Sequence, residues 1–171
     1  FLEEALDWIT GDKIEIYMSG HQHVADAQEL WQYYQSVISW IERIFPEYRK
    51  IMKGRDWGRL YNSYKDGNYN AATLEARIKE LIEDDEVDSK QGIYEYLLSG
   101  DEKTLSLRQF DAKMKIKVYE RQKGVCPKCD KQFTIDQMEA DHIVPWSKGG
   151  KTDEGNCMML CMPCNRTKSG K

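Results

Sequence analysis

Four of the five cysteines in this 171-residue chain are arranged in two C-x-x-C pairs. The pairs are Cys126 with Cys129 and Cys161 with Cys164, and 31 residues lie between them. Two such pairs can reach one metal ion from two tight turns, and four thiolates match the tetrahedral coordination of Zn²⁺. The sequence therefore predicts one structural zinc ion per chain, bound by all four side chains.

The segment between the two pairs contains polar residues that a purely structural zinc site does not need. Asp141 and His142 stand side by side and are followed by Ile143-Val144-Pro145. The pattern predicts a strand over 133–135, a turn, and a second strand over 138–143. Adjacent side chains on a strand face opposite sides, so both can serve one site only if the strand ends or bends there.

The charge of the chain is unevenly distributed. Residues 1–102 contain 11 Lys and Arg against 21 Asp and Glu, a net charge of −10, whereas residues 103–171 contain 14 against 8, a net charge of +6. Four zinc-bound thiolates would lower the latter to about +4. A basic C-terminal segment fits a polyanionic partner, and the acidic remainder does not.

Apolar residues recur at helical spacing through the first hundred residues. The expected helices cover residues 1–9, 24–45, 55–66, 73–83 and 92–98, and a further helix over 111–123 leads into the first cysteine pair. The charge changes sign near residues 99–103. We therefore expect an α+β chain with a mostly helical domain over 1–105 and a small zinc-containing module over 106–171.

The remaining sequence features limit the surroundings of the protein. No stretch approaches 18 uninterrupted apolar residues, so no membrane span or membrane partner is expected. Cysteines in metal-binding spacing suit a reducing cytoplasm better than an oxidising compartment. The fifth cysteine, Cys157, is expected to pack as a small apolar residue. The chain begins with Phe1 rather than Met, which fits either a processed piece or a fragment whose native N-terminus lies elsewhere.

Several of these residues have the chemistry of phosphodiester hydrolysis. His142 can take a proton from water near neutral pH. Asp141 and Asn165 offer oxygen ligands of the kind that Mg²⁺ and Mn²⁺ prefer, and Asn165 directly follows Cys164, so the zinc would help to position it. Phosphate contacts are predicted for four basic residues of this segment: Lys148, Lys151, Arg166 and Lys168.

Taken together, these motifs resemble the HNH endonucleases. The resemblance covers residues 115–171 and rests on the Asp141-His142 pair, on Gly149-Gly150, and on both cysteine pairs. It implies a ββα-metal fold with a four-cysteine zinc addition, and an enzyme that cleaves double-stranded DNA. His142 would be the general base and Asp141 a metal ligand. Asn156 would brace the loop, and Asn165 would replace the final His as a metal ligand.

The N-terminal half carries a looser resemblance. Residues 31–34, 46–50 and 53–61 are similar to the region before the nuclease in bacterial proteins with an N-terminal DUF262 (ParB-like nucleotidase) domain. This implies a role in restriction or phage defence, with an upstream domain as an additional partner. The alternative hypothesis is a non-catalytic zinc-knuckle module that binds DNA or protein.

Overall fold

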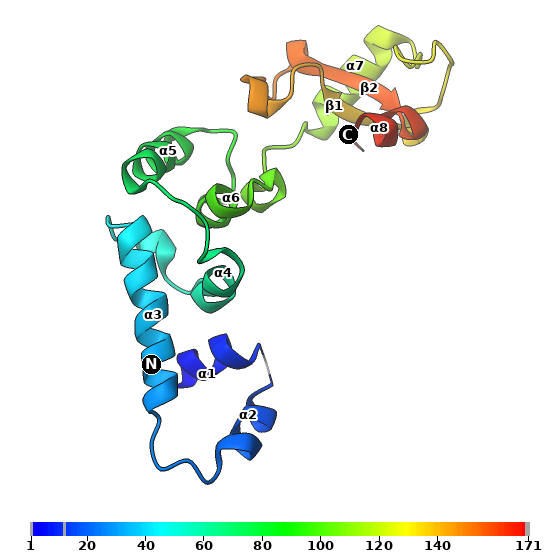
Figure 1. Ribbon diagram of the computed structural model, residues 1–171. Helices are drawn as coiled ribbons and strands as arrows, with labels where there is room; N and C mark the ends of the chain where they lie inside the picture. The colour runs from blue at the N-terminus through cyan, green and yellow to red at the C-terminus, as the bar shows by residue number, and fades with distance from the viewer. Residues whose placement is uncertain (1, 12, 170–171) are drawn as a thin grey trace. The chain divides into compact units, whose positions relative to one another are not determined.

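A computed structural model of the chain describes residues 2–11 and 13–169. The chain divides into two compact units, Phe1–Ser106 and Leu107–Lys171 (Figure 1). Each unit has its own core, so the two are described separately. The predicted α+β class is confirmed, because helices accompany a small two-stranded antiparallel sheet.

The N-terminal unit is built from helices. None of the described helices is long and apolar enough to cross a membrane. Among these helices, only the one over residues 14–21 was not expected from the sequence. It buries no side chain, and apolar periodicity, the signal used to predict helices, arises from a buried face. The helices are α1 (Leu2–Thr10), α2 (Ile14–His21), α3 (Gln28–Ile44), α4 (Trp57–Tyr64), α5 (Ala71–Glu83) and α6 (Ile93–Ser99), with 3₁₀ turns at Lys50–Met52, Lys90–Gly92 and Glu102–Leu105.

Aromatic side chains form the core of this unit. The ring of Tyr94 from α6 is fully buried and meets Phe45 edge to face at a centroid distance of 5.0 Å and Trp57 at 5.5 Å. Such pairs add about 0.5–1.5 kcal/mol beyond the burial of their area. Gly58 lets α4 approach α1, because a Cβ there would lie 2.1 Å from Cβ of Trp8.

The C-terminal unit places a helix beside a hairpin-like sheet and a final helix (Figure 1). Helix α7 (Ala112–Gln122) is followed by strand β1 (Met138–His142), strand β2 (Cys157–Cys161) and helix α8 (Met162–Ser169). The strands are antiparallel, with Met138 opposite Cys161 and His142 opposite Cys157. Two strands followed directly by a helix form the ββα arrangement that the sequence motifs imply.

Helix α7 is tied to β2 by one glutamine. The Gln122 side chain donates to the carbonyl of Met159 at 2.9 Å and accepts from its amide at 2.8 Å, as a neighbouring strand would. The prediction for Cys157 is confirmed, since it is 1% exposed and packs in the core. That core consists of Phe110, Val118, Cys126, Met138, Cys157, Met159, Leu160 and Cys161.

One predicted pairing is wrong. Residues 133–135 were expected to pair with the strand over 138–143, but β1 pairs with β2, which follows a loop of 14 residues. Residues Ile135–Gln137 form a 3₁₀ turn in which the Gln137 side chain accepts from the amide and hydroxyl of Thr134. The Thr134 amide thus has a hydrogen-bond partner within the turn and does not pair with β1. Strand β1 pairs instead with a segment that is distant in sequence.

Candidate functional site

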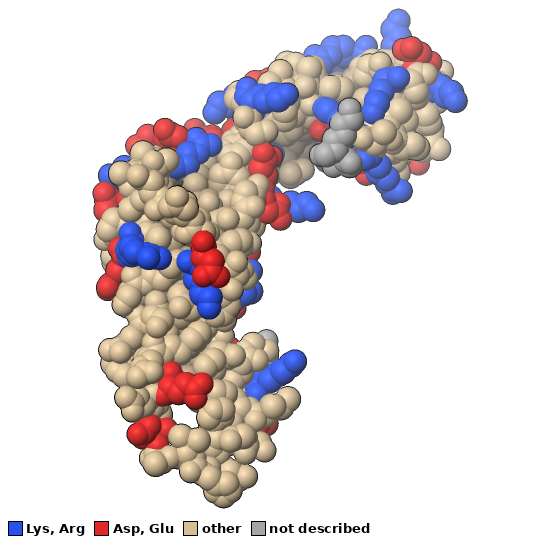
Figure 2. Space-filling view, viewed as in Figure 1, with Lys and Arg blue, Asp and Glu red and all other residues tan. Residues whose placement is uncertain are grey.

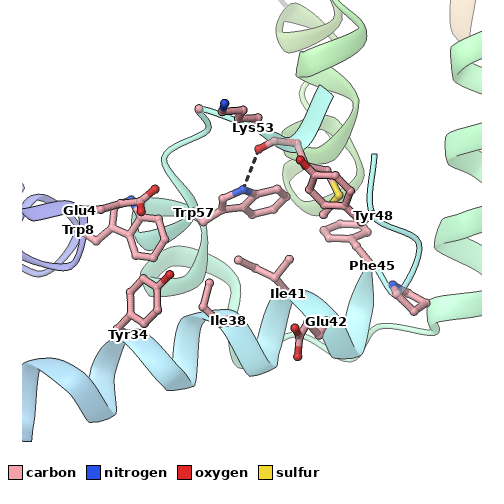
Figure 3. A pocket seen from close by; sticks show the side chains of 13 residues that line it. Glu4, Trp8, Tyr34, Ile38, Ile41, Glu42, Phe45, Tyr48, Lys53 and Trp57 are labelled. Carbon is pink, nitrogen blue, oxygen red and sulfur yellow. Dashed lines mark hydrogen bonds between the residues drawn. The ribbon is translucent and has the colours of Figure 1, made fainter. Parts of the chain in front are cut away.

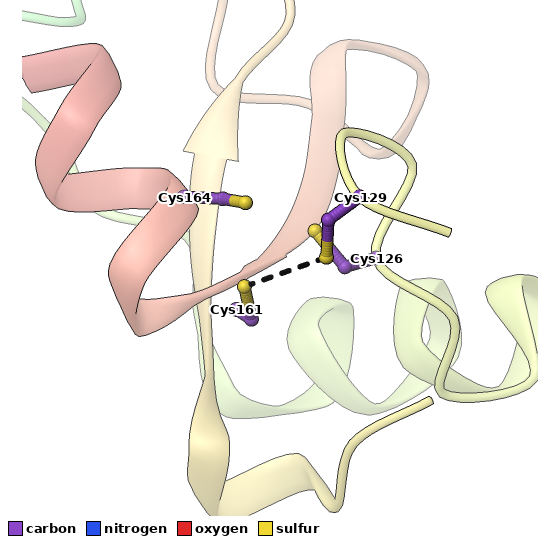
Figure 4. Close-up of side chains that lie close together, drawn as sticks. All are labelled: Cys126, Cys129, Cys161 and Cys164. Atoms are coloured by element: carbon purple, nitrogen blue, oxygen red, sulfur yellow. Dashed lines mark hydrogen bonds between the residues drawn. The ribbon is translucent and has the colours of Figure 1, made fainter. Parts of the chain in front are cut away.

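The four paired cysteines come together, as predicted. Their sulfur atoms all lie within 4.8 Å of one another, and the Sγ atoms of Cys129 and Cys161 are 3.9 Å apart (Figure 4). Tetrahedral zinc with bonds of about 2.3 Å requires sulfur separations of about 3.8 Å. Cys126 and Cys129 lie on the turn after α7, whereas Cys161 ends β2 and Cys164 lies in the first turn of α8. The cluster therefore joins three elements.

The surroundings of this cluster suit thiolates with a bound cation. Burial works to raise the pKa of the Cys126 thiol, but backbone hydrogen bonds from Cys161, Lys128 and Cys129 outweigh it and lower that pKa to about 6. The neighbouring Cys161 thiol, followed by burial, raises the pKa of Cys164 to about 12. Four close sulfurs cannot all ionise without a positive charge between them, and a divalent metal supplies that charge.

The Asp141-His142 pair lies at the end of β1, the strand that α8 packs against. The Asp141 carboxylate accepts from the His142 amide at 2.9 Å and forms an ion pair of 2.5 Å with Nζ of Lys168 on α8. Lys168 also donates to the His142 carbonyl. Lys168 was predicted to contact phosphate, but its ammonium group is directed at the protein.

A second carboxylate lies on the same face of β1 and has no place in the sequence prediction. Glu139 is two residues before Asp141, and its Oε2 accepts from the carboxamide of Asn165 at 2.7 Å. The bond orients the Asn165 side chain, whose oxygen is the atom able to bind a cation. The i, i+2 spacing of Glu139 and Asp141 on a predicted strand was the signal available in the sequence. Glu139, Asp141, Asn165 and Lys168 thus form a polar row between β1 and α8.

His142 has different neighbours from Asp141, as alternation along a strand requires. Its ring packs against Phe110, with centroids 4.3 Å apart and planes inclined by 41°. Its Nε2 lies 3.0 Å from the hydroxyl of Thr152. Thr152 lies in the loop between β1 and β2, and Phe110 comes before α7, so sequence proximity pointed to neither residue. The half-buried imidazole is held from two sides.

Asn156 ties together the loop that follows His142. Its Oδ1 accepts from the Val144 amide at 2.8 Å, while its Nδ2 donates to the carbonyls of Val144 at 2.9 Å and Lys151 at 2.8 Å. Its backbone carbonyl accepts from Ile143. Gly150 is required here, because a Cβ would lie 1.8 Å from the Val144 carbonyl oxygen. One side chain thus closes a loop of about a dozen residues.

Replacing Asn156 with Ala should loosen this loop without releasing the metal of the cysteine cluster. Three side-chain hydrogen bonds disappear, each worth about 0.5–1.5 kcal/mol net. We expect hydrogen exchange at the Val144 amide to accelerate by at least about tenfold. The exchange rate in Asn156→Asp should lie between those of wild type and Asn156→Ala, because Asp keeps the acceptor oxygen and loses both N–H donors. Unchanged exchange in Asn156→Ala would contradict the assigned bracing.

The basic residues near this site differ in position. Lys148 and Lys151 are exposed in the loop between β1 and β2, and Arg166 is exposed on α8. Both units show both signs of charge on their visible faces, and Lys and Arg side chains are the more prominent on the C-terminal unit (Figure 2). Exposed Lys and Arg side chains therefore accompany the Asp141-His142 pair in the C-terminal unit.

A cavity of about 360 Å³ lies in the N-terminal unit, away from these groups. Trp8, Tyr34 and Trp57 line it, with Phe45 and Tyr48 at one end (Figure 3). Trp57 already donates its indole N–H to the Met52 carbonyl. Most of its lining residues are apolar, although Glu4, Glu42 and Lys53 also line it. We place the candidate site in the C-terminal unit because Asp141, His142 and Asn165 all lie there, on β1 and α8.

Comparison with known proteins agrees with this placement. Residues 126–171 match the family model of the HNH endonucleases, so the C-terminal unit contains an HNH endonuclease domain. It is a module of nuclease type, and the resemblance inferred from the sequence motifs is confirmed over these residues. No curated protein matches the chain significantly. The match begins at Cys126, so α7 and the segment before it lie outside the matched residues.

Proposed function

We propose that the chain is a metal-dependent endonuclease that hydrolyses phosphodiester bonds in double-stranded DNA. The observation that carries this proposal is the position of Asp141 and His142 at the end of β1, against a helix that begins at the cysteine cluster and carries Asn165. A zinc-binding module that only binds nucleic acid needs the cysteines and the basic residues. It has no use for an acid–imidazole pair at this position.

In the proposed reaction, His142 accepts a proton from the attacking water. Asp141 and Asn165 would hold Mg²⁺ or Mn²⁺, which when bound supplies charge stabilisation at the scissile phosphate and the leaving oxygen. The residues fit such an ion, since a carboxylate and a carboxamide oxygen are hard ligands and Glu139 adds negative charge nearby. The ammonium of Lys168 beside Asp141 indicates that this row already attracts a cation.

The proposed partner is duplex DNA. Lys148, Lys151 and Arg166 are exposed cations of the same unit, and residues 103–171 carry a net charge of +6. Contacts of this kind are electrostatic and independent of sequence, so binding should weaken as salt rises. Lys168 would have to leave Asp141 before it could contact a phosphate, so we assign it to the site itself.

The wider setting follows from looser indications. Cysteines that bind metal rather than pairing as disulfides favour a reducing cytoplasm. Residues 31–34, 46–50 and 53–61 are similar to the region before the nuclease in bacterial proteins with an N-terminal DUF262 domain, and this similarity supports a role in restriction or phage defence. An upstream domain of the same protein would then be a partner of the N-terminal unit, whose net charge of −10 over residues 1–102 makes it a poor DNA-binding surface.

Nicking of supercoiled plasmid distinguishes this proposal from its rival. The zinc-loaded chain is incubated with plasmid across a titration of Mg²⁺ and Mn²⁺. We expect cleavage that depends on the added metal and stops with chelator. The rival hypothesis, a non-catalytic zinc-knuckle module, predicts retardation of the plasmid without cleavage in any metal.

Asn165→Ala should raise the metal concentration needed for cleavage. The substitution removes a ligand oxygen, and even residues that only orient ligands change metal affinity by roughly 10–100-fold. Direct binding of Mn²⁺, followed by electron paramagnetic resonance, should weaken to the same extent, with zinc content unchanged. Asn165→His supplies a ring nitrogen instead and should bind Mn²⁺ more tightly than Asn165→Ala does. Equal Mn²⁺ affinity in wild type and Asn165→Ala would remove Asn165 from the ligand set.

A further inference from the structure

Two residues around the His142 imidazole, Phe110 and Arg108, lie outside the residues that match the HNH family model. The segment before α7 supplies the Phe110 ring against one face of the imidazole and the carbonyl of Arg108 below Thr152. This segment also precedes Cys126, where the match to the HNH family begins. The surroundings of the candidate base therefore include a part of the chain that the family comparison does not cover.

One contact of the Thr152 hydroxyl has a fixed direction, because the Arg108 carbonyl can only accept a hydrogen bond. Its hydroxyl donates to the Arg108 carbonyl at 3.3 Å and lies 3.0 Å from Nε2 of His142. A threonine hydroxyl has one proton to donate but can accept as well. With that proton directed at Arg108, the hydroxyl accepts from His142, which places the imidazole proton on Nε2. The lone pair is then on Nδ1.

The packing of the His142 ring against Phe110 does not by itself determine which ring nitrogen meets Thr152. An imidazole that rotates by half a turn about its Cβ–Cγ bond keeps nearly the same shape against Phe110 but exchanges ring nitrogens with ring carbons. Only a directional partner distinguishes the two orientations. Thr152 can act as that partner because it is 7% exposed, which limits competition from water for its hydroxyl. Among the described residues, Nδ1 has no hydrogen-bond partner of its own.

We propose that Thr152 is a positioning residue, whose hydroxyl, anchored on the Arg108 carbonyl, holds His142 in the tautomer that leaves Nδ1 unprotonated. A base needs its lone pair on the nitrogen that meets the water, so this bond decides which nitrogen can act. The inference rests on the proposed function for its effect on cleavage. The tautomer itself is a property of the fold and can be measured without cleavage.

The test compares Thr152→Val with Thr152→Ser in the 171-residue, zinc-loaded chain. Valine keeps the shape of the side chain and removes the hydroxyl, whereas serine keeps the hydroxyl. Thr134→Val is the matched control, because it removes an exposed hydroxyl at the opposite end of β1. The first readout is the tautomer of neutral His142, from long-range ¹H–¹⁵N spectra without added Mg²⁺ or Mn²⁺. The second is the rate of plasmid nicking, resolved into kcat and KM.

We expect wild type, Thr152→Ser and Thr134→Val to show a proton on Nε2, and Thr152→Val to show a mixture of tautomers. In Thr152→Val kcat should fall by roughly 10–100-fold, the usual effect of removing a group that orients another, with KM unchanged. A wild-type tautomer in Thr152→Val overturns the proposal, as does an altered tautomer with an unchanged kcat. If the tautomer changes but wild type cleaves no DNA, the positioning stands and the proposed nuclease function fails.

Discussion

His142→Ala is expected to lower the rate of plasmid cleavage by about 10²–10⁴-fold, the usual contribution of a positioned general base. The imidazole of His142, which packs against Phe110, is the proposed acceptor of the proton from the attacking water. Its removal leaves Asp141, Asn165 and the cysteine cluster in place. Zinc content, overall fold and affinity for DNA should therefore stay close to those of wild type.

The measurement is the initial rate of nicking across a Mn²⁺ titration, with zinc content determined on the same preparation. His23→Ala is the matched control, since His23 is exposed in the N-terminal unit and should have no effect. Cleavage by His142→Ala at the wild-type rate would exclude it as the base. If wild type itself is inert in every metal, the non-catalytic hypothesis gains support.

Cys129→Ser should unfold the C-terminal unit and leave the N-terminal helices folded. The core of this unit is small, with eight buried residues, two of which belong to the cluster. Structural zinc contributes about 10–16 kcal/mol of apparent binding free energy in small zinc domains. Whole domains are stable by only about 5–15 kcal/mol, so loss of the metal exceeds what this core can offset.

Hydrogen exchange and elemental analysis test this expectation. Amides in α7, β2 and α8 should lose protection in Cys129→Ser, while those in α3 and α5 keep it. The parent chain, purified without chelator, should contain one zinc ion. Cys157→Ala is the control, because this buried cysteine lies outside the cluster and its loss should leave zinc content unchanged. A zinc content well under one ion per wild-type chain would contradict the prediction of a structural zinc site.

Much of the architecture follows from patterns that are local in sequence. Helices α3 and α5 bury one face each, and their apolar residues recur at the spacing that a helix requires. Each C-x-x-C pair presents both thiols from a single turn. Helix α2 was not predicted, because it has eight residues and buries none of them, so it has no buried apolar face to give a helical pattern in the sequence.

Pairing between strands was the part that local pattern could not decide. Alternation identified β1, but it carries no information on the partner, and the nearer segment at 133–135 was the wrong choice. The partner, β2, was hidden because its sequence Cys157-Met-Met-Leu-Cys161 is buried along almost its whole length and has no alternation of polar and apolar residues.

The sequence by itself determined the two cysteine pairs, the helical character of the N-terminal unit and the acid–imidazole pair, because each depends on a short stretch of residues. Only the tertiary structure decided what surrounds His142 and Asp141. Phe110 and Thr152 reach the imidazole from positions 32 residues before it and 10 after it, and Lys168 returns to Asp141 from 27 residues away. Contacts of this kind depend on which surfaces the strands and helices bury together, and that is settled only when the whole unit packs.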